Sequence, residues 1–310
     1  MNIEKERQAL QYLKAFEPKT EPYYLCYSGG KDSDTILQLA RLADVNFEAV
    51  HNLTTVDAPE TIQYIKSQPE IRIDRPDISM WKLIVKKRMP PTRLARYCCE
   101  YLKERGGKSR VKITGVRWAE SAKRKESAGV IKVIGKEKTM RALAEELGIE
   151  AQNTKQGGLI MNDDNAETRR FVEQCYRTTS TMVNPIVDWT DEDVWEFLHH
   201  YGIRSNPIYD VQDIGGTFRP CGRNRVGCIG CPMAVAAVRK KELIKYPKYR
   251  DNYLRAFIRM IKKREEAGTT SPWGTARETM IWWVEDDPNQ LSLFGDPEYL
   301  KNLPSDLVGK

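Results

Sequence analysis

The sequence predicts an α/β fold with a doubly wound, mostly parallel sheet and a helical C-terminal part. Three observations predict it. Short apolar runs alternate with segments of helical spacing over residues 23–116, the same rhythm returns at 181–202, and the spacing is helical alone from about residue 234. Because parallel strands need crossover helices, this alternation favours a sheet that is covered on both faces.

The predicted elements follow in chain order. Residues 1–22 begin with a charged amphipathic segment, which predicts an N-terminal helix. Apolar runs bounded by turn residues predict strands at residues 23–28, 46–53, 71–74, 111–116 and 181–186. Helical spacing predicts helices at residues 33–43, 59–67, 79–88, 92–104 and 191–202.

Residues 125–180 interrupt this rhythm. Their apolar part at 130–138 predicts a hairpin, a helical segment follows at 139–148, and the rest is polar and rich in Asn and Asp. We expect this insertion to be an excursion near the active site. The predicted organisation has three parts. An N-terminal helix covers residues 1–22, an α/β domain with the insertion covers 23–233, and a helical region covers 234–310.

The composition limits the class of protein. Of the 310 residues, 40% are hydrophobic and 30% are charged, which is typical of a globular chain rather than a disordered one. No apolar run reaches the roughly 20 residues that a membrane helix needs, and the first residues lack the apolar centre of a signal peptide. We therefore expect a cytoplasmic protein without membrane contact. The net charge of +7 fits either an ordinary basic surface or an anionic partner.

A glycine-containing loop stands between the first predicted strand and its helix. Two glycines let the backbone approach a ligand closely, and the helix start adds free N–H groups at the positive end of its dipole. The spacing differs from that of a GxxxxGK[ST] loop. A plain turn would explain the glycines alone, but the whole strand–loop–helix context predicts a nest for a phosphate or sulfate, formed by Ser28, Gly29, Gly30, Lys31, Asp32 and Ser33.

This loop, SGGKDS, resembles the PP-loop of the adenine nucleotide alpha-hydrolase superfamily. Further segments, in the same order over residues 20–235, narrow the resemblance to the phosphoadenosine phosphosulfate (PAPS) reductase family. The resemblance implies a Rossmann-like adenine nucleotide alpha-hydrolase fold. The segments are a shortened DTG…PET motif at 55–61, CC…K at 98–103, GxR…ES…R at 115–124, an NPL-like motif with WT..DVW at 184–195, NP.YD at 206–210 and CxxC at 228–231.

Two arginines of the GxR…ES…R motif are interpreted as anion clamps. Guanidinium forks suit phosphate and sulfate oxygens, and Arg117 directly follows a strand end, where α/β folds bind their ligands. For Arg117 and Arg124 alike, the alternative is a surface ion pair with Glu120 or Glu126.

Asp57 also lies just past a predicted strand end. It could contact the ribose or hold the Mg²⁺ that accompanies ATP, and a role as a helix N-cap is an equal alternative. We expect Asp57 in the nucleotide site, and we expect the catalytic residues to be Lys31, Asp32 and Arg117.

Clustered cysteines indicate a metal site. Thiolate is the preferred ligand of iron–sulfur clusters and of structural zinc, whereas a cytosolic chain does not favour disulfides. The resemblance implies a [4Fe–4S] cluster on two cysteine pairs, with zinc as the alternative. A second set, which adds Cys221 and drops one of the adjacent pair, resembles DNA-phosphorothioation ATPases of the superfamily. Cys26 and Cys175 are expected in the core. The five candidate ligands are Cys98, Cys99, Cys221, Cys228 and Cys231.

The resemblance implies two chemistries on the same loop. A sulfonucleotide reductase attacks the sulfur of adenylyl sulfate or PAPS with a C-terminal cysteine, but residues 232–310 contain no cysteine. We therefore favour an ATP pyrophosphatase that adenylates an acceptor in sulfur transfer. A reductase is the alternative, and a non-catalytic nucleotide sensor or complex subunit is the third. The expected partners are ATP or PAPS/adenylyl sulfate, a sulfur-donor protein and a nucleic-acid acceptor for the basic C-terminal helices.

Overall fold

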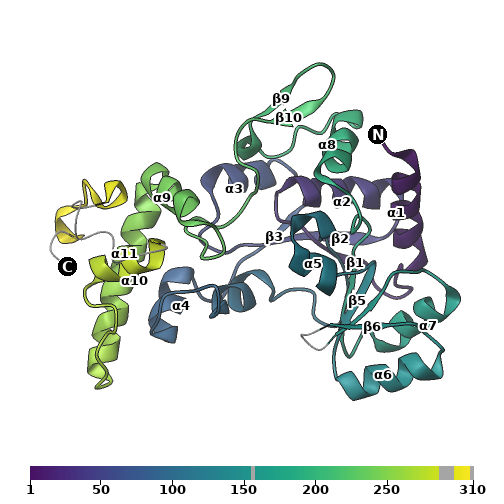
Figure 1. Cartoon of the computed structure of the whole chain (residues 1–310), viewed down its shortest axis with the longest axis horizontal. Coiled ribbons are helices and arrows are strands. Elements are labelled where there is room, and N and C mark those ends of the chain that lie inside the picture. The colour runs from purple at the N-terminus through teal and green to yellow at the C-terminus, as the bar shows by residue number, and fades with distance from the viewer. Residues whose placement is uncertain (155–157, 286–296, 308–310) are drawn as a thin grey trace. The chain divides into compact units, whose positions relative to one another are not determined.

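The alternating apolar runs form strands of one eight-stranded sheet. Figure 1 shows helices beside this sheet. Its strand order is β3-β2-β1-β4-β8-β5-β7-β6. The inner strand β1 is parallel to β2 and β4, and β4 is parallel to β8. The strands are β1 (Tyr23–Cys26), β2 (Phe47–Asn52), β3 (Arg72–Asp74), β4 (Val111–Ile113), β5 (Ile131–Ile134), β6 (Gln152–Thr154), β7 (Gly158–Met161) and β8 (Ser180–Val183).

The computed structural model describes residues 1–154, 158–285 and 297–307. Parts of the predicted insertion and of the predicted helical region, at 155–157, 286–296 and 308–310, lie outside these residues. The chain divides into two units. The first, which we call the α/β unit, is Met1–His51, Pro59–Asp74 and Gly106–Val226, and the second, the helical unit, is Asn52–Ala58, Arg75–Arg105 and Gly227–Lys310.

This division differs from the predicted domains. Residues 1–22 belong to the α/β unit, and residues 227–233 belong to the helical unit. Segments 52–58 and 75–105 come from inside the predicted α/β domain, yet they belong to the helical unit. The CC and CxxC segments are therefore both parts of the helical unit, whereas the SGGKDS loop belongs to the α/β unit.

Helices of the α/β unit follow the predicted spacing. The N-terminal helix α1 and helix α8 both contact α2, the helix that follows the SGGKDS loop (Figure 1). The apolar face of α2 buries Ile36, Leu37 and Leu39 in the core. Helices of this unit are α1 (Ile3–Ala15), α2 (Lys31–Leu42), α3 (Pro59–Lys66), α5 (Ala122–Ser127), α6 (Glu137–Glu146), α7 (Ala166–Cys175) and α8 (Asp191–His200).

The insertion lengthens the sheet. Strand β5 is antiparallel to β8 on one side and to β7 on the other, and β6 is antiparallel to β7. The predicted hairpin at 130–138 is wrong, because the chain enters helix α6 at Glu137 and both partners of β5 come from later in the sequence. Glu, Lys, Met, Arg, Ala and Leu are good helix formers, which explains this early helix start.

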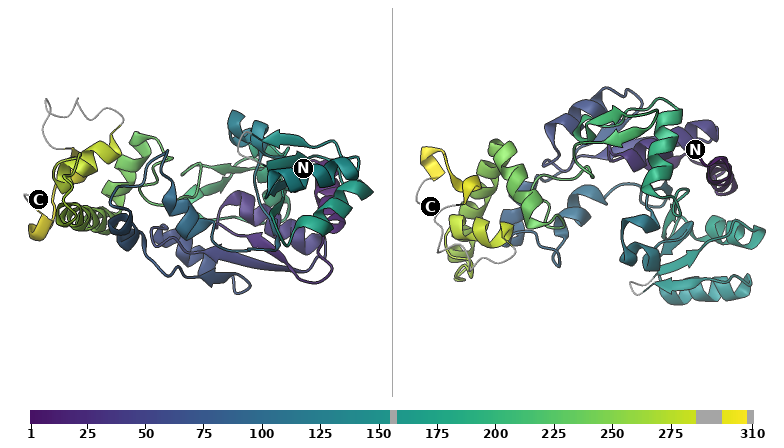
Figure 2. Two further views of the ribbon diagram at one scale, coloured as in Figure 1. Left: turned by 90° about the horizontal axis from the view of Figure 1, so that it is seen from below. Right: turned by 45° about the horizontal axis from the view of Figure 1, so that its top comes forward.

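The helical unit packs around its longest helix. Helix α10 contacts both α4 and α11, and these segments bury Leu83, Phe257 and Trp283. The yellow-green helices of the C-terminal region lie together in both views of Figure 2. Among the described residues, no helix is both long and apolar enough to span a bilayer. The helices are α4 (Met80–Lys87), α9 (Ala236–Lys245), α10 (Pro247–Glu266) and α11 (Ala276–Val284).

The helix predicted at 92–104 is confirmed only in its second part. Helical structure covers residues 97–103, of which Cys99–Lys103 form a helix of the π type, whereas residues 92–96 are not helical. Ahead of it, the backbone N–H of Thr92 donates to the carbonyl of Ala95, and the N–H of Ala95 donates to the Thr92 hydroxyl. A threonine side chain that bonds the nearby backbone competes with helix formation, which accounts for the difference.

Candidate phosphate-binding site and cysteine group

The SGGKDS loop closes tightly between β1 and α2. Gly29 has φ +74°, a left-handed conformation that side chains rarely adopt. The Ser33 hydroxyl accepts from the Gly30 N–H at 2.9 Å and donates to the Gly30 carbonyl at 2.7 Å. In the described part of the chain, the N–H groups of Asp32 and Ser33 have no acceptor. The first turn of α2 thus keeps two donors for an anion.

Four charged side chains form a closed network beside this turn. Lys31 Nζ lies 3.2 Å from Asp191 Oδ1 and 3.4 Å from Asp32 Oδ2. Arg117 donates from Nε to Asp32 at 2.7 Å and from a terminal nitrogen to Asp191 at 2.6 Å. Each carboxylate therefore bridges a lysine and an arginine. We call these four residues the loop network.

The loop network corrects the expected partners of Arg117. Its side chain is 2% exposed, and it pairs with Asp32 and Asp191 rather than with Glu120 or Glu126 on the surface. A further guanidinium nitrogen donates to the Trp189 carbonyl at 3.1 Å. Three nitrogens of this guanidinium thus contact protein acceptors, and a contact of Arg117 with a bound anion stays a prediction.

Asp191 is a site residue that the sequence analysis missed. It opens α8, and its side chain is 70% exposed. Burial opposes its ionisation, but Lys31 and Arg117 outweigh burial and lower the pKa of Asp191. The available signal was its place one residue after the WT pair of the WT..DVW motif, at a helix start.

Segment 205–209 braces the loop from a distant part of the chain. The amide of Asn206 donates to the Gly29 carbonyl at 2.9 Å, and the N–H of Lys31 donates to the Tyr209 hydroxyl at 3.1 Å. The Ser205 hydroxyl donates to Asp34 at 2.6 Å. Pro207–Tyr209 form a 3-10 turn within the NP.YD motif, and the contacts of this turn with the loop were not predicted.

Asp34 is the buried anchor of this brace. The Tyr27 hydroxyl and the Ser205 hydroxyl both donate to its carboxyl group. Burial raises the pKa of Asp34 to about 6, against the opposing effect of these hydrogen bonds. Asp34 lines a cavity of about 220 Å³ with Leu37, Arg41, Tyr64, Gln68 and Ile203.

Arg124 forms the surface ion pair that was the alternative to an anion clamp. Its guanidinium lies 3.9 Å from Glu120, and that carboxylate is also 3.6 Å from Arg225. Both arginine side chains are largely exposed, so the structure places Arg124 in a surface ion pair. Such pairs contribute little to stability, which leaves the guanidinium accessible to an anion.

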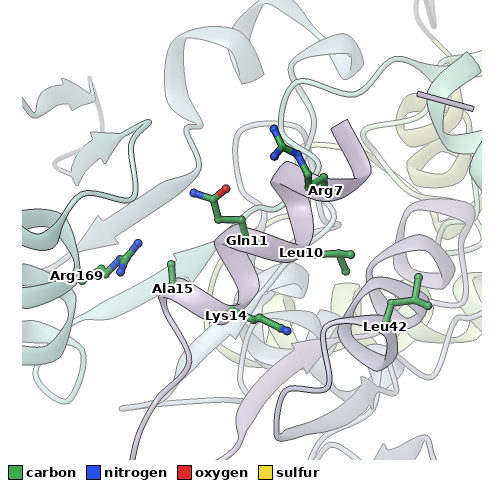
Figure 3. Close-up of a pocket in the computed structure, with 7 residues that line it drawn as sticks. All are labelled: Arg7, Leu10, Gln11, Lys14, Ala15, Leu42 and Arg169. Atoms are coloured by element: carbon green, nitrogen blue, oxygen red, sulfur yellow. The ribbon is translucent and has the colours of Figure 1, made fainter. Parts of the chain in front are cut away.

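A second groove on the α/β unit lies apart from the loop network. It has a volume of about 420 Å³. Figure 3 shows side chains of α1, including Arg7, Gln11 and Lys14, along it. None of its lining residues belongs to the SGGKDS loop, so the groove adds nothing to the predicted site.

In the helical unit, four of the five candidate cysteines interact. Cys98 is hydrogen-bonded to Cys99 and interacts electrostatically with Cys228 and Cys231. The hydrogen bond with Cys99 and burial raise the pKa of Cys98. The hydrogen bonds that Cys99 forms with Cys98 and Arg96 lower the pKa of Cys99. We call Cys98, Cys99, Cys228 and Cys231 the cysteine group.

Local contacts fix the CxxC segment. The Cys228 thiol donates to the Thr54 hydroxyl at 3.4 Å, and burial raises the pKa of Cys228 to about 12. Glu242 accepts from the N–H of Gly230 at 2.8 Å.

Among the described residues, no set of three or more His, Cys, Asp or Glu side chains that could hold a metal ion is found. The four thiols nevertheless supply the donor set that iron–sulfur clusters and zinc prefer.

Cys221 is separate from the cysteine group. It belongs to the α/β unit, is exposed, and lies with its sulfur 3.8 Å from the Arg219 carbonyl. Cys175 is buried in α7, as expected, and Cys26 is partly buried in β1. The structure therefore groups four of the five predicted ligands.

Asp57 lies in the helical unit beside the cysteine group. Its carboxylate accepts from the Thr54 N–H at 2.7 Å, and its backbone forms an antiparallel bridge with Cys228. These contacts place Asp57 in a turn that bridges to Cys228, and its contact with ribose or Mg²⁺ stays a prediction.

Comparison with known proteins identifies the family of this chain. Residues 22–234 match the family model described as the phosphoadenosine phosphosulfate reductase domain. Adenosine 5′-phosphosulfate reductases from Bacillus thuringiensis (strain Al Hakam) and Bacillus cereus (strain B4264) are each 29% identical over 75 residues, and that of Bacillus cytotoxicus is 28% identical. These matches span 23% of this chain and 28% of each relative. Because the family model covers more than half of the sequence, the chain belongs to the PAPS reductase family.

Proposed function

We propose that this chain is an ATP pyrophosphatase that adenylates an acceptor in sulfur transfer. The observation that supports it most is the first turn of α2. There, the free N–H groups of Asp32 and Ser33 stand beside the largely buried charge of Lys31. Oriented N–H groups and a lysine suit the pyrophosphate part of a nucleotide.

In this proposal, the loop acts by neutralising and positioning charge. An acceptor oxygen attacks the α-phosphorus of ATP, the α–β P–O bond breaks, and pyrophosphate leaves with the bonding electrons. Lys31 offsets the charge that develops on the leaving group, with Mg²⁺ as its expected partner. Asp32 and Arg117 act on Lys31 through the loop network, since they fix its ammonium. A sulfur nucleophile then displaces AMP from the adenylated acceptor.

The cysteine group is the proposed site of a [4Fe–4S] cluster, with zinc as the alternative. Its ligands would be Cys98, Cys99, Cys228 and Cys231, whose mutual interactions support a shared cation. A bound cluster would supply one-electron redox chemistry.

A sulfonucleotide reductase is the second candidate, because the matched relatives carry that activity in their names. In that case, a cysteine thiolate attacks the sulfur of adenylyl sulfate or PAPS, the S–O bond breaks, and the nucleotide leaves as a phosphate. A thiol reductant then releases sulfite and is itself oxidised. Cys221 is the exposed thiol outside the cysteine group and is the candidate nucleophile.

Parallel assays separate these functions. The protein, purified without oxygen, is tested for pyrophosphate release from ATP and for sulfite release from adenylyl sulfate and PAPS. We expect pyrophosphate release, and Lys31→Ala should lower kcat by about 10²–10³-fold. Lys14→Ala, on helix α1, is the matched control that should leave kcat unchanged. Sulfite release that Cys221→Ser abolishes would establish the reductase instead.

Two further outcomes concern partners. Tight nucleotide binding without either product would indicate a sensor or complex subunit. A nucleic-acid acceptor should bind with an affinity that falls steeply with salt, because phosphate contacts release counterions. If turnover occurred only with small acceptors and did not depend on salt, a nucleic-acid acceptor would be excluded.

A further inference from the structure

Tyr209 meets the phosphate loop at its first helical residue. Its side chain is 2% exposed and packs edge-on against Trp195, with ring centroids 5.3 Å apart. The N–H of Lys31 donates to its hydroxyl at 3.1 Å, and the backbone N–H of Val226 interacts with the same oxygen. The phenol therefore lies among the backbone donors that open α2.

The phenol oxygen of Tyr209 accepts hydrogen bonds, but its O–H group is available to donate one. A phenolic oxygen accepts through its lone pairs and donates one O–H. The Lys31 and Val226 N–H groups use its acceptor capacity. Within the described ranges, no acceptor is found for its own hydrogen. A buried donor without a protein partner costs free energy, which is recovered when a ligand accepts from it.

Two further observations relate this donor to the loop. A Cβ atom at Gly30 would lie 3.1 Å from the Tyr209 hydroxyl, so the oxygen stands directly over the loop backbone. Burial raises the pKa of Tyr209, so the phenol keeps its proton at neutral pH and stays a donor. The neighbouring N–H groups of Asp32 and Ser33 are also free.

We propose that Tyr209 is an anion-binding residue that donates its O–H to a phosphate oxygen of the nucleotide held on the SGGKDS loop. The inference rests on the proposed nucleotide function. A phosphate offers several acceptor oxygens, which match the O–H of Tyr209 and the N–H groups of Asp32 and Ser33. Tyr209 thereby joins the binding site from nearly 180 residues away in the sequence.

The direct test replaces Tyr209 with Phe and measures the Kd of ATP, of pyrophosphate and of adenosine by calorimetry. Loss of a hydrogen bond to a charged group should weaken ATP and pyrophosphate by about 10-fold or more, with adenosine unchanged. Tyr23→Phe is the matched control, since its buried hydroxyl donates to the Leu13 carbonyl at the other end of β1. Equal affinities in Tyr209→Phe and the wild type would overturn the proposal.

A second variant separates ligand contact from support of the loop. A fluorinated tyrosine at position 209, whose phenol titrates nearer neutrality, keeps the lone pairs that accept from Lys31 and Val226. If Tyr209 donates to the anion, pyrophosphate affinity should fall, relative to the wild type, as pH rises through the new phenol pKa. If Tyr209 only supports the loop, affinity should hold or rise, and the proposal fails. If the wild type itself binds neither ATP nor pyrophosphate, the proposed function fails first.

Discussion

The phosphate loop and the cysteine group differ in what holds them. In the α/β unit, each charge beside the loop meets an opposite charge, and the backbone is braced by Ser33, Asn206 and Tyr209. In the helical unit, the Cys98 thiol interacts with those of Cys99, Cys228 and Cys231, while Arg96 interacts with Cys99 and Lys103 with Cys228. The charges beside the loop are thus paired before a ligand arrives, whereas burial and neighbouring thiols oppose the ionisation of Cys98.

The largest effect should follow from removing one thiol of the cysteine group. In the proposed cluster site each of the four cysteines would supply one ligand, so Cys228→Ser should reduce bound iron or zinc by at least about 10-fold. Metal analysis and the visible spectrum of protein purified without oxygen provide the measurement. A Cys228→Ser protein that keeps its full metal content would remove this cysteine from the site.

Cys221→Ser is the control for that comparison. Cys221 lies in the α/β unit, whereas the cysteine group lies in the helical unit, so we expect its loss to leave the metal content unchanged. Loss of metal in Cys221→Ser would instead support the alternative ligand set that includes it.

Arg117→Ala should produce the next largest effect, now in the α/β unit. It leaves Asp32 and Asp191 with Lys31 as their remaining partner in the loop network and removes a buried side chain. We expect a loss of about 3 kcal/mol in the free energy of unfolding, since the guanidinium is buried but Asp191 is largely exposed. Hydrogen exchange of the amides of β1 and β4 reports this unit directly.

Arg117→Lys sharpens the same test. A lysine keeps one charge but cannot bridge both carboxylates with a planar fork. We expect it to restore part of the stability while nucleotide turnover stays low. Full activity in Arg117→Lys would show that charge alone, without the fork, is sufficient at this position.

Short-range patterns account for what the sequence predicted well. The SGGKDS loop, the strand β1 before it and the helix α2 after it are contiguous, so spacing alone located them. The parallel direction of β2, β1, β4 and β8 followed from the alternation of strands and helices, whereas their order in the sheet was not predicted. The prediction that residues 20–235 resemble the PAPS reductase family is confirmed by the family match.

Long-range pairings account for what it missed. Asp191, Ser205 and Tyr209 reach the loop from about 160 to 180 positions later, and periodicity carries no signal for such contacts. The same holds for β5, whose partners β7 and β8 could not be read from the apolar run at 130–138. The local hydrogen bonds of Thr92 likewise replace helical structure in the first part of a segment where spacing alone favoured a helix.

A smaller, pH-dependent effect should come from the buried anchor Asp34. Its folded pKa, about 6, lies above the unfolded value of about 3.9, so the folded state binds the extra proton between these values. Stability is therefore fully present below about pH 4 and falls by on the order of 2–3 kcal/mol as pH rises through about 6. Asp34→Asn, which resembles the protonated form, should lose this part of the pH dependence in urea titrations. If the free energy of unfolding depended on pH in the same way in Asp34→Asn and in the wild type, Asp34 would ionise in the folded protein as it does in the unfolded chain.

The smallest effect should come from matched helix caps in the two units. Thr190 caps α8 and Thr275 caps α11, each in a reciprocal pair with the third helical residue. Replacing either with Ala should cost about 1 kcal/mol in the unfolding of its own unit. Because Asp191 follows Thr190 directly, Thr190→Ala should also disturb the contact with Lys31 and weaken ATP binding, whereas Thr275→Ala should not. Equal ATP affinity in the two variants would mean that the loop network tolerates a frayed α8, and that Arg117 alone is enough to hold Asp191 in place.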